Sequence, residues 1–159
     1  MKVILKEIEN QDEKSKICGE ILRALPEWFG VEKYIVDYVK QVKGLPFFVA
    51  LLGDEIIGFI TIKRHNNFTA EIYVMGIDKK YHRQGIGKLL YQYCESFCIK
   101  NKFEFLTVKT LDNSAEYEPF ERTRQFYSKM GFKPLEIFPT VWDKENPCLV
   151  MIKHLRGEL

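Results

Sequence analysis

The sequence has no long hydrophobic run, no linker rich in proline, glycine or serine, no internal repeat and no low-complexity segment. Without a run of membrane-spanning length or an apolar N-terminal leader, neither a membrane partner nor a secretory signal is predicted. Without a linker, we expect residues 1–159 to form a single domain, a length that can bury a substantial core. These absences predict a soluble, cytoplasmic protein.

Paired cysteines and excess charge are absent too. The four cysteines, Cys18, Cys94, Cys98 and Cys148, contain no Cys-x-x-Cys pair, so we expect neither a metal site nor a disulfide framework. Lys and Arg number 24 against 22 acidic residues, a net charge of +2. Because the charge is nearly balanced, no nucleic-acid partner is expected, and any anion-binding site must be local.

What the sequence does contain is a regular succession of apolar patterns. Strands are predicted at about 2–8, 46–52, 55–63, 68–77, 103–109, 132–138 and 148–153. Helices are predicted at about 12–25, 31–43, 86–100 and 119–130. A helical crossover makes the strands before and after it parallel, whereas the short turns predict antiparallel neighbours. The expected fold class is α/β (α+β), with a mixed, mainly antiparallel sheet of about seven strands flanked by about four helices.

A glycine-containing loop, Tyr81–Lys88, joins an apolar strand to an amphipathic helix. The first turn of a helix presents unpaired amides and the positive end of the helix dipole. Gly85 and Gly87 would let a diphosphate approach those amides closely, and Arg83 and Lys88 add positive charge. The loop therefore predicts a pyrophosphate site, and the alternative is an ordinary strand-to-helix turn.

Two better-known phosphate loops are excluded by spacing. A Walker A loop requires a glycine where this chain has His82 and a serine or threonine where it has Leu89. The dinucleotide fingerprint requires a third glycine, where Leu90 stands.

Three segments together resemble the GNAT superfamily of N-acetyltransferases, which transfer an acetyl group from acetyl-CoA to an amine. Residues 83–88 are similar to the family's pyrophosphate loop, 71–78 to its central strand and 126–132 to its C-terminal helix and turn. The order of predicted elements is similar over essentially the whole chain. Two positions depart from the family pattern: His82 stands where Gln or Arg is usual, and Phe120 where Asn is usual.

The resemblance implies acetyl-CoA as co-substrate. It assigns the diphosphate to Arg83, Gln84, Gly85, Ile86, Gly87 and Lys88. It assigns the tetrahedral oxyanion and the pantetheine arm to the main chain of Met75, Gly76 and Ile77, although Gly76 also fits a simple strand ending.

The reaction requires a base and an acid. An alkyl amine with a pKa of about 10.4 must lose a proton before it attacks, at a cost of about 4.6 kcal/mol at neutral pH. The resemblance implies Glu71 as the base, directly or through water, whereas strand alternation alone favours a solvent-facing carboxylate. It implies Tyr127 as the acid that protonates the leaving thiolate, and the alternative is packing between helix and sheet.

The amine acceptor is less constrained. Trp28, Phe29 and Tyr73 are candidates to line an apolar slot, with Glu116 and Glu118 attracting a cationic amine. Aromatic residues beside a helix break are more often core contacts, and acidic loops are usually just solvated. A small amine, an amino-acid derivative, an aminoglycoside or a protein lysine would all fit.

Two other functions stay open on these residues. A non-catalytic acyl-CoA-binding module needs the glycine loop but neither Glu71 nor Tyr127. An acetylating toxin acting on charged tRNA needs a basic surface, which the balanced charge does not support. By analogy with similar enzymes, a homodimer is an expected assembly.

Overall fold

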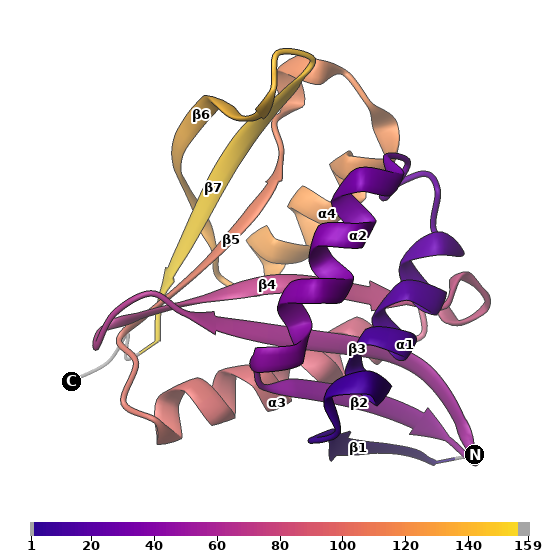
Figure 1. Cartoon of the computed structure of the whole chain (residues 1–159). Coiled ribbons are helices and arrows are strands. Elements are labelled where there is room, and N and C mark those ends of the chain that lie inside the picture. The colour runs from indigo at the N-terminus through magenta and orange to yellow at the C-terminus, as the bar shows by residue number, and fades with distance from the viewer. Residues whose placement is uncertain (1, 156–159) are drawn as a thin grey trace. The chain divides into compact units, whose positions relative to one another are not determined.

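Seven strands form one sheet in the order β1-β2-β3-β4-β5-β7-β6 (Figure 1). The computed structural model describes residues 2–155. The strands are β1 (Val3–Glu7), β2 (Phe47–Leu52), β3 (Glu55–Arg64), β4 (Thr69–Ile77), β5 (Phe105–Leu111), β6 (Lys133–Asp143) and β7 (Asn146–His154). The helices are α1 (Gln11–Arg23), α2 (Glu32–Gln41), α3 (Ile86–Lys100) and α4 (Glu118–Lys129), with short 3₁₀ turns η1 (Val42–Gly44), η2 (Lys79–Tyr81) and η3 (Asn113–Ala115).

The strand directions confirm the predicted mixed sheet. β1 with β2, β2 with β3, β5 with β7 and β6 with β7 are antiparallel. β4 and β5 are parallel, with Thr69 opposite Phe105 and Ile72 opposite Val108. The helical crossover through α3 requires this parallel pair.

The last two strands are longer than the pattern predicts. β6 continues to Asp143, which pairs with Asn146 across a tight turn, whereas the apolar pattern ends at 138. The strand lies at the edge of the sheet, and Pro139 falls in the irregular stretch between Phe138 and Asp143, where the regular pairing with β7 is interrupted.

The chain divides into two compact units, which are described separately. The first unit comprises Met1–Lys63 and Tyr73–Phe97, and the second comprises Arg64–Ile72 and Cys98–Leu159. Strand β4 therefore contributes residues to both.

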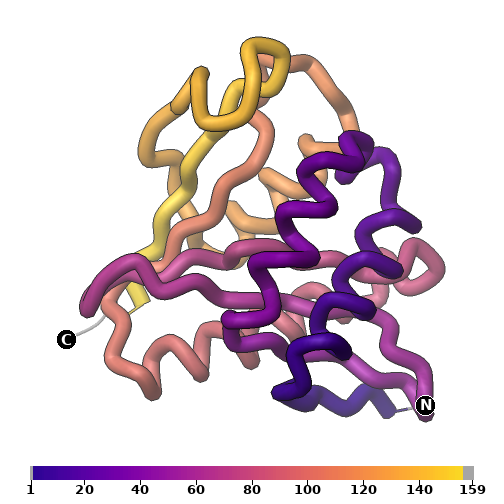
Figure 2. The backbone as a smooth tube through the Cα atoms, viewed as in Figure 1, coloured from indigo at the N-terminus to yellow at the C-terminus, as the bar shows by residue number. Residues whose placement is uncertain are grey.

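In the first unit, β2 separates two apolar layers. Phe47 stacks on Phe59 at 5.0 Å within a cluster that α1 and α2 complete, and Figure 2 shows those helices crossing in front of β2 and β3. Phe48 contacts Tyr93 and Phe97 of α3, at 5.0 and 5.1 Å between ring centroids. Because successive strand residues point to opposite faces, two adjacent phenylalanines anchor helices on both sides.

In the second unit, α4 lies against β5 and ends at Lys129, and Gly131 two residues later has a φ of 100° that suits glycine. The side chains of Leu106 and Val108 of β5 and Met151 of β7 are buried. No helix within residues 2–155 combines the length and the apolar character needed to cross a bilayer.

All four cysteines are buried and free, and they occur in both units. No cluster of three or more potential metal-ligating side chains occurs within the described residues.

Candidate active site

The strongest candidate for ligand binding in the first unit is the loop between η2 and α3. Residues 83–85 are exposed, while Ile86 is buried and fixes the start of the helix. Arg83 and Gly85 have φ angles of 63° and 81°, so the chain turns twice through the left-handed region. A Cβ on Gly85 would meet nothing within 4 Å, so the space above the loop is open.

The main-chain amides of this loop point to an anion site. Within residues 2–155, none of the amides from Arg83 to Lys88 donates to a protein acceptor, and the first to do so is Leu89, to the Gly85 carbonyl at 3.1 Å. Arg83 and Lys88 are exposed and have no ion-pair partner in the same range. A row of unpaired amides at a helix N-terminus, flanked by two cations, is what a diphosphate requires.

Two of the predicted contacts in this loop are restricted to the main chain. The Gln84 side chain donates to the Lys80 carbonyl oxygen at 3.1 Å. Ile86 is 5% exposed, and its side chain belongs to the core. In both residues the main-chain amide stays available for an anion.

His82, a departure from the family pattern, makes contacts that sequence reasoning did not find. Its Nε2 donates to the Ile77 carbonyl oxygen at 2.7 Å, and its ring lies 5.5 Å from the Trp28 ring in an edge-to-face arrangement. Trp28 follows α1 and stands more than fifty residues earlier, so no local pattern could have linked the two.

Gly76 is required by packing as well as by any ligand role. A Cβ there would lie 2.9 Å from Cγ2 of Ile21, 3.2 Å from Phe59 and 3.3 Å from Leu22. The glycine therefore allows α1 to approach β4 closely. The assignment of the Met75, Gly76 and Ile77 main chain to the thioester and pantetheine stays a prediction.

Glu71, in the second unit, is held by two side chains, those of Lys109 and His65. Its side chain is 4% exposed, and Lys109 Nζ lies 3.0 Å from both carboxylate oxygens. His65 Nε2 lies 2.6 Å from Oε1, and its side chain is 37% exposed. The expectation from strand alternation, a solvent-facing carboxylate, is wrong. A buried carboxylate costs several kcal/mol unless it is paired, and this one is paired twice.

Tyr127, the predicted acid, is 5% exposed on α4. Its ring meets Phe126 at 5.2 Å and Phe132 at 5.5 Å between centroids, both edge to face. The aromatic contacts fix the ring and are compatible with either predicted role.

The predicted acceptor residues fall into two groups. Phe29 and Tyr73 are joined through Tyr38 of α2, whose ring lies 6.1 Å from Phe29 and 5.3 Å from Tyr73. Lys63 Nζ lies 5.5 Å from the Tyr73 centroid. Trp28 instead contacts His82. The sequence places Tyr38 on the apolar side of a predicted helix. It does not show that this side packs against Tyr73 of β4, because tertiary packing decides that contact.

The acidic residues proposed to attract an amine differ in their surroundings. Glu118 pairs with Arg122 at 3.3 Å in the first turns of α4. Glu116 adopts a left-handed φ of 53° at the end of η3 and is exposed. Nothing in these contacts singles out either carboxylate as a ligand for an amine.

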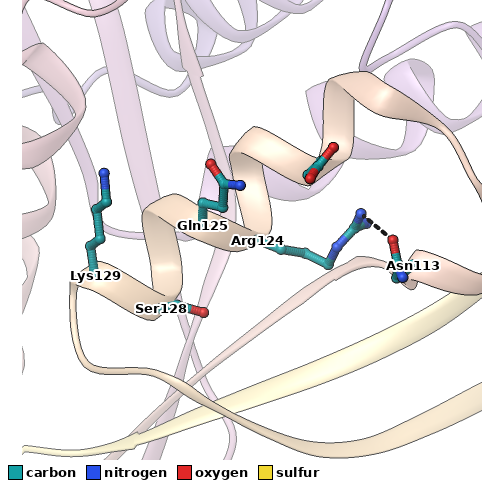
Figure 3. Close-up of a pocket in the computed structure, with 6 residues that line it drawn as sticks. Asn113, Arg124, Gln125, Ser128 and Lys129 are labelled. Carbon is teal, nitrogen blue, oxygen red and sulfur yellow. Dashed lines mark hydrogen bonds between the residues drawn. The ribbon is translucent and has the colours of Figure 1, made fainter.

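A surface pocket of about 420 Å³ lies along α4 and is lined by Asn113, Glu121, Arg124, Gln125, Ser128 and Lys129 (Figure 3). Arg124 points toward Asn113 and donates to its Oδ1 at 3.2 Å and to the Leu111 carbonyl at 2.6 Å. Arg124 thus joins α4 to the loop after β5. None of the predicted site residues lines this pocket.

A family comparison decides the assignment that these features suggest. A model of the acetyltransferase (GNAT) domain matches residues 43–134, which is more than half of the chain and includes both β4 and the loop before α3. The chain belongs to the GNAT acetyltransferase family. The predicted resemblance is confirmed.

Solved structures share the fold over nearly the whole chain. Ard1 from Thermoplasma volcanium aligns with a TM-score of 0.77 at 16% identity, covering 97% of this chain and 98% of that one. The aminoglycoside 6'-N-acetyltransferase from Enterococcus faecium aligns with a TM-score of 0.75 at 16% identity, covering 98% of this chain and 99% of that one. A GNAT family acetyltransferase from Elizabethkingia anophelis, with acetyl-CoA bound, aligns with a TM-score of 0.72 at 17% identity, covering 96% of this chain and 97% of that one. At these identities the likeness shows the fold. No curated protein sequence matches the chain.

Proposed function

We propose that this GNAT protein is an N-acetyltransferase that transfers an acetyl group from acetyl-CoA to a primary amine by direct attack in a ternary complex. The observation that carries the proposal is the open run of main-chain amides from Arg83 to Lys88, flanked by two cations. Among the described residues, neither these amides nor the Arg83 and Lys88 side chains have a protein partner. A related fold with acetyl-CoA bound supports the choice of ligand. No metal has a role in this chemistry.

In this proposal the amides and cations of residues 83–88 bind the diphosphate of the coenzyme. Anchoring the diphosphate removes much of the translational freedom of the thioester at its far end. The main chain of Met75, Gly76 and Ile77 then binds the pantetheine arm and stabilises the oxyanion that forms when the amine attacks.

The base is the pair formed by Glu71 and His65. A carboxylate that already accepts from Lys109 on both oxygens has little capacity left for a substrate proton. His65 donates from Nε2 to Glu71, which leaves Nδ1 as the acceptor nitrogen on a partly exposed ring. The proton leaves the ammonium for His65 Nδ1, and the Glu71 carboxylate stabilises the imidazolium, as a buried acid does in a catalytic triad.

The collapse of the tetrahedral intermediate breaks the carbon–sulfur bond and releases a thiolate. Tyr127 donates its phenolic proton to that sulfur. The nitrogen loses its second proton to solvent, and solvent returns a proton to the phenolate. Trp28, Phe29 and Tyr73 are proposed to line the side from which the amine, free or on a peptide, enters. Neither nucleic acid nor membrane is a partner in this proposal.

Coenzyme binding is tested by calorimetry on two matched glycine variants. Gly85 and Gly53 both have positive φ angles, 81° and 63°, and a Cβ on either would meet nothing within 4 Å. G85A and G53A therefore incur a similar backbone strain of about 1 kcal/mol. Only G85A should weaken coenzyme A binding, by about tenfold or more, because only its amides face the diphosphate.

Turnover is tested by thiol release from acetyl-CoA with a panel of aminoglycosides, aliphatic and aromatic amines, amino-acid derivatives and lysine peptides. E71Q and H65Q should each lower kcat about 10²-fold to 10⁴-fold with the best amine. E20Q, which changes an exposed carboxylate of α1, is the control and should match the wild type. Coenzyme binding without turnover on any amine would favour the non-catalytic module instead.

A further inference from the structure

Two segments of the first unit that the proposed function uses separately are joined by direct contacts. The segment Pro26–Gly30 follows α1 and carries Trp28 and Phe29, which are proposed acceptor residues. The segment Ile77–His82 leads directly into the diphosphate loop. We refer to these as the acceptor segment and the lead-in segment.

The first contact is made by rings. The Trp28 and His82 ring centroids are 5.5 Å apart with an interplanar angle of 71°. The same His82 donates from Nε2 to the Ile77 carbonyl oxygen at 2.7 Å. The imidazole is therefore fixed on one side to the end of β4 and on the other side to the acceptor segment.

The second contact is an ion pair. Lys79 of η2 pairs with Glu27, the residue before Trp28. The hydrogen bond from Lys79, with a smaller contribution from His82, lowers the pKa of Glu27, so the carboxylate stays ionised at neutral pH. Two neighbouring residues of the acceptor segment are thus held by two residues of the lead-in segment.

The position of His82 makes these contacts sensitive to the diphosphate. Arg83, the next residue, has a left-handed φ of 63° and is the first residue of the open amide row. An anion bound by the amides of 83–88 therefore acts next to the peptide bond that joins His82 to Arg83. His82 is the residue next to the amide row on its N-terminal side, so its imidazole is the nearest preceding side chain to a bound diphosphate.

We propose that His82 and Trp28 are positioning residues that couple the diphosphate loop to the acceptor segment, so that bound coenzyme organises the side of the site that receives the amine. This inference rests on the proposed function, because it assumes that the diphosphate binds at 83–88. It predicts ordered binding, with the coenzyme before the amine. A GNAT chain with Gln or Arg in place of His82 lacks the ring that makes the contact.

Tryptophan fluorescence tests the coupling directly. The chain has two tryptophans, and W142F leaves Trp28 as the only one. In that background, coenzyme A should change the Trp28 emission in a saturable way, with the same Kd that calorimetry gives. Replacing His82 by Gln keeps an amide donor for the Ile77 carbonyl but removes the ring. H82Q should therefore still bind coenzyme A, with a loss below about tenfold, and show no Trp28 response.

A matched pair of lysine variants controls for general damage to the loop. K79A removes the ion pair with Glu27 and should reduce the Trp28 response. K80A removes the neighbouring lysine of η2, whose partner is Glu55 of β3, and should leave the response unchanged. If H82Q does not fold, K79A and K80A still decide the question.

The outcomes separate the two proposals. Calorimetric binding with no change in Trp28 emission, or an undiminished response in both H82Q and K79A, would overturn the coupling and leave the acetyltransferase proposal intact. An absence of any binding heat would overturn the proposed function, and the coupling with it.

Discussion

At the scale of single residues, Glu71 shows how partners determine what a carboxylate can do. The side chain is buried, and Lys109 and His65 together satisfy it. The family resemblance singled out the position, but no sequence pattern gave its environment, because Lys109 is 38 residues away and reaches Glu71 only when β4 and β5 pair in parallel. The register that sets Glu71 opposite Thr107 places Lys109 two residues further along the same face.

Removing Lys109 should therefore destabilise the protein. K109M leaves the buried carboxylate with His65 alone. We expect a loss of about 2 kcal/mol, below the roughly 3–5 kcal/mol of a fully buried pair, because a third of the Lys109 side chain is exposed. Urea unfolding, monitored by circular dichroism, measures this loss in the free energy of unfolding. K80M breaks an exposed pair and should cost less than about 0.5 kcal/mol, so equal losses in both variants would contradict the argument.

Tyr127 allows a second test at this scale. Y127F removes only the hydroxyl and keeps the contacts of the ring with Phe126 and Phe132. If the phenol is the acid, kcat should fall about 10²-fold to 10⁴-fold while the Kd for coenzyme A is retained. An equal loss of affinity and turnover, measured by calorimetry and thiol release, would make the tyrosine a binding or packing residue.

At the scale of elements, Gly76 links helix α1 to strand β4. The sequence shows a glycine near the end of a strand, a pattern that fits a bulge, a strand ending or a ligand site equally well. The structure adds a further reason, the close approach of Ile21 and Leu22 from α1. No local pattern could reveal it, because Gly76 is more than fifty residues from Ile21 and Leu22 in the chain.

The corresponding prediction compares two glycines with different surroundings. G76A places a Cβ 2.9 Å from Ile21 and should lower stability by about 1–3 kcal/mol through overpacking. Gly44 has nothing within 4 Å of the same position, so G44A should have a much smaller effect. Thermal unfolding of both variants measures the difference. Equal stability of the G76A and G44A variants would contradict the argument, because it would mean that Ile21 and Leu22 of α1 can move away from a Cβ at position 76 without loss of stability.

At the scale of the whole molecule, buried cysteines make the stability of the protein depend on pH. All four are buried free thiols. Burial raises the pKa of Cys18 from 9.0 to about 12 and that of Cys148 to about 11. In the native protein these thiols stay protonated under conditions in which the unfolded chain ionises.

The free energy of unfolding falls with pH wherever the native protein holds more protons than the unfolded chain. Above pH 9.0 the unfolded chain releases thiol protons that the native protein retains, so the free energy of unfolding should fall between pH 9.0 and about 11. Urea unfolding under reducing conditions at a series of pH values measures the slope. A protein carrying both C18A and C148A should show a shallower slope, and an unchanged slope would assign the effect to other groups.

The sequence by itself determined the order of the elements and the position of the glycine-containing loop, because each depends on residues close together in the chain. The resemblance to the family came from three such local segments, and the binding of a diphosphate at 83–88 stays a prediction. Apolar periodicity set the strands and helices, and the glycines and cations of 83–88 are consecutive. Tertiary structure alone decided the pairing of Glu71 with His65 and Lys109, the packing around Gly76 and the contact between Trp28 and His82. These contacts join distant segments, and their partners are selected by strand register and helix packing, which no local pattern records.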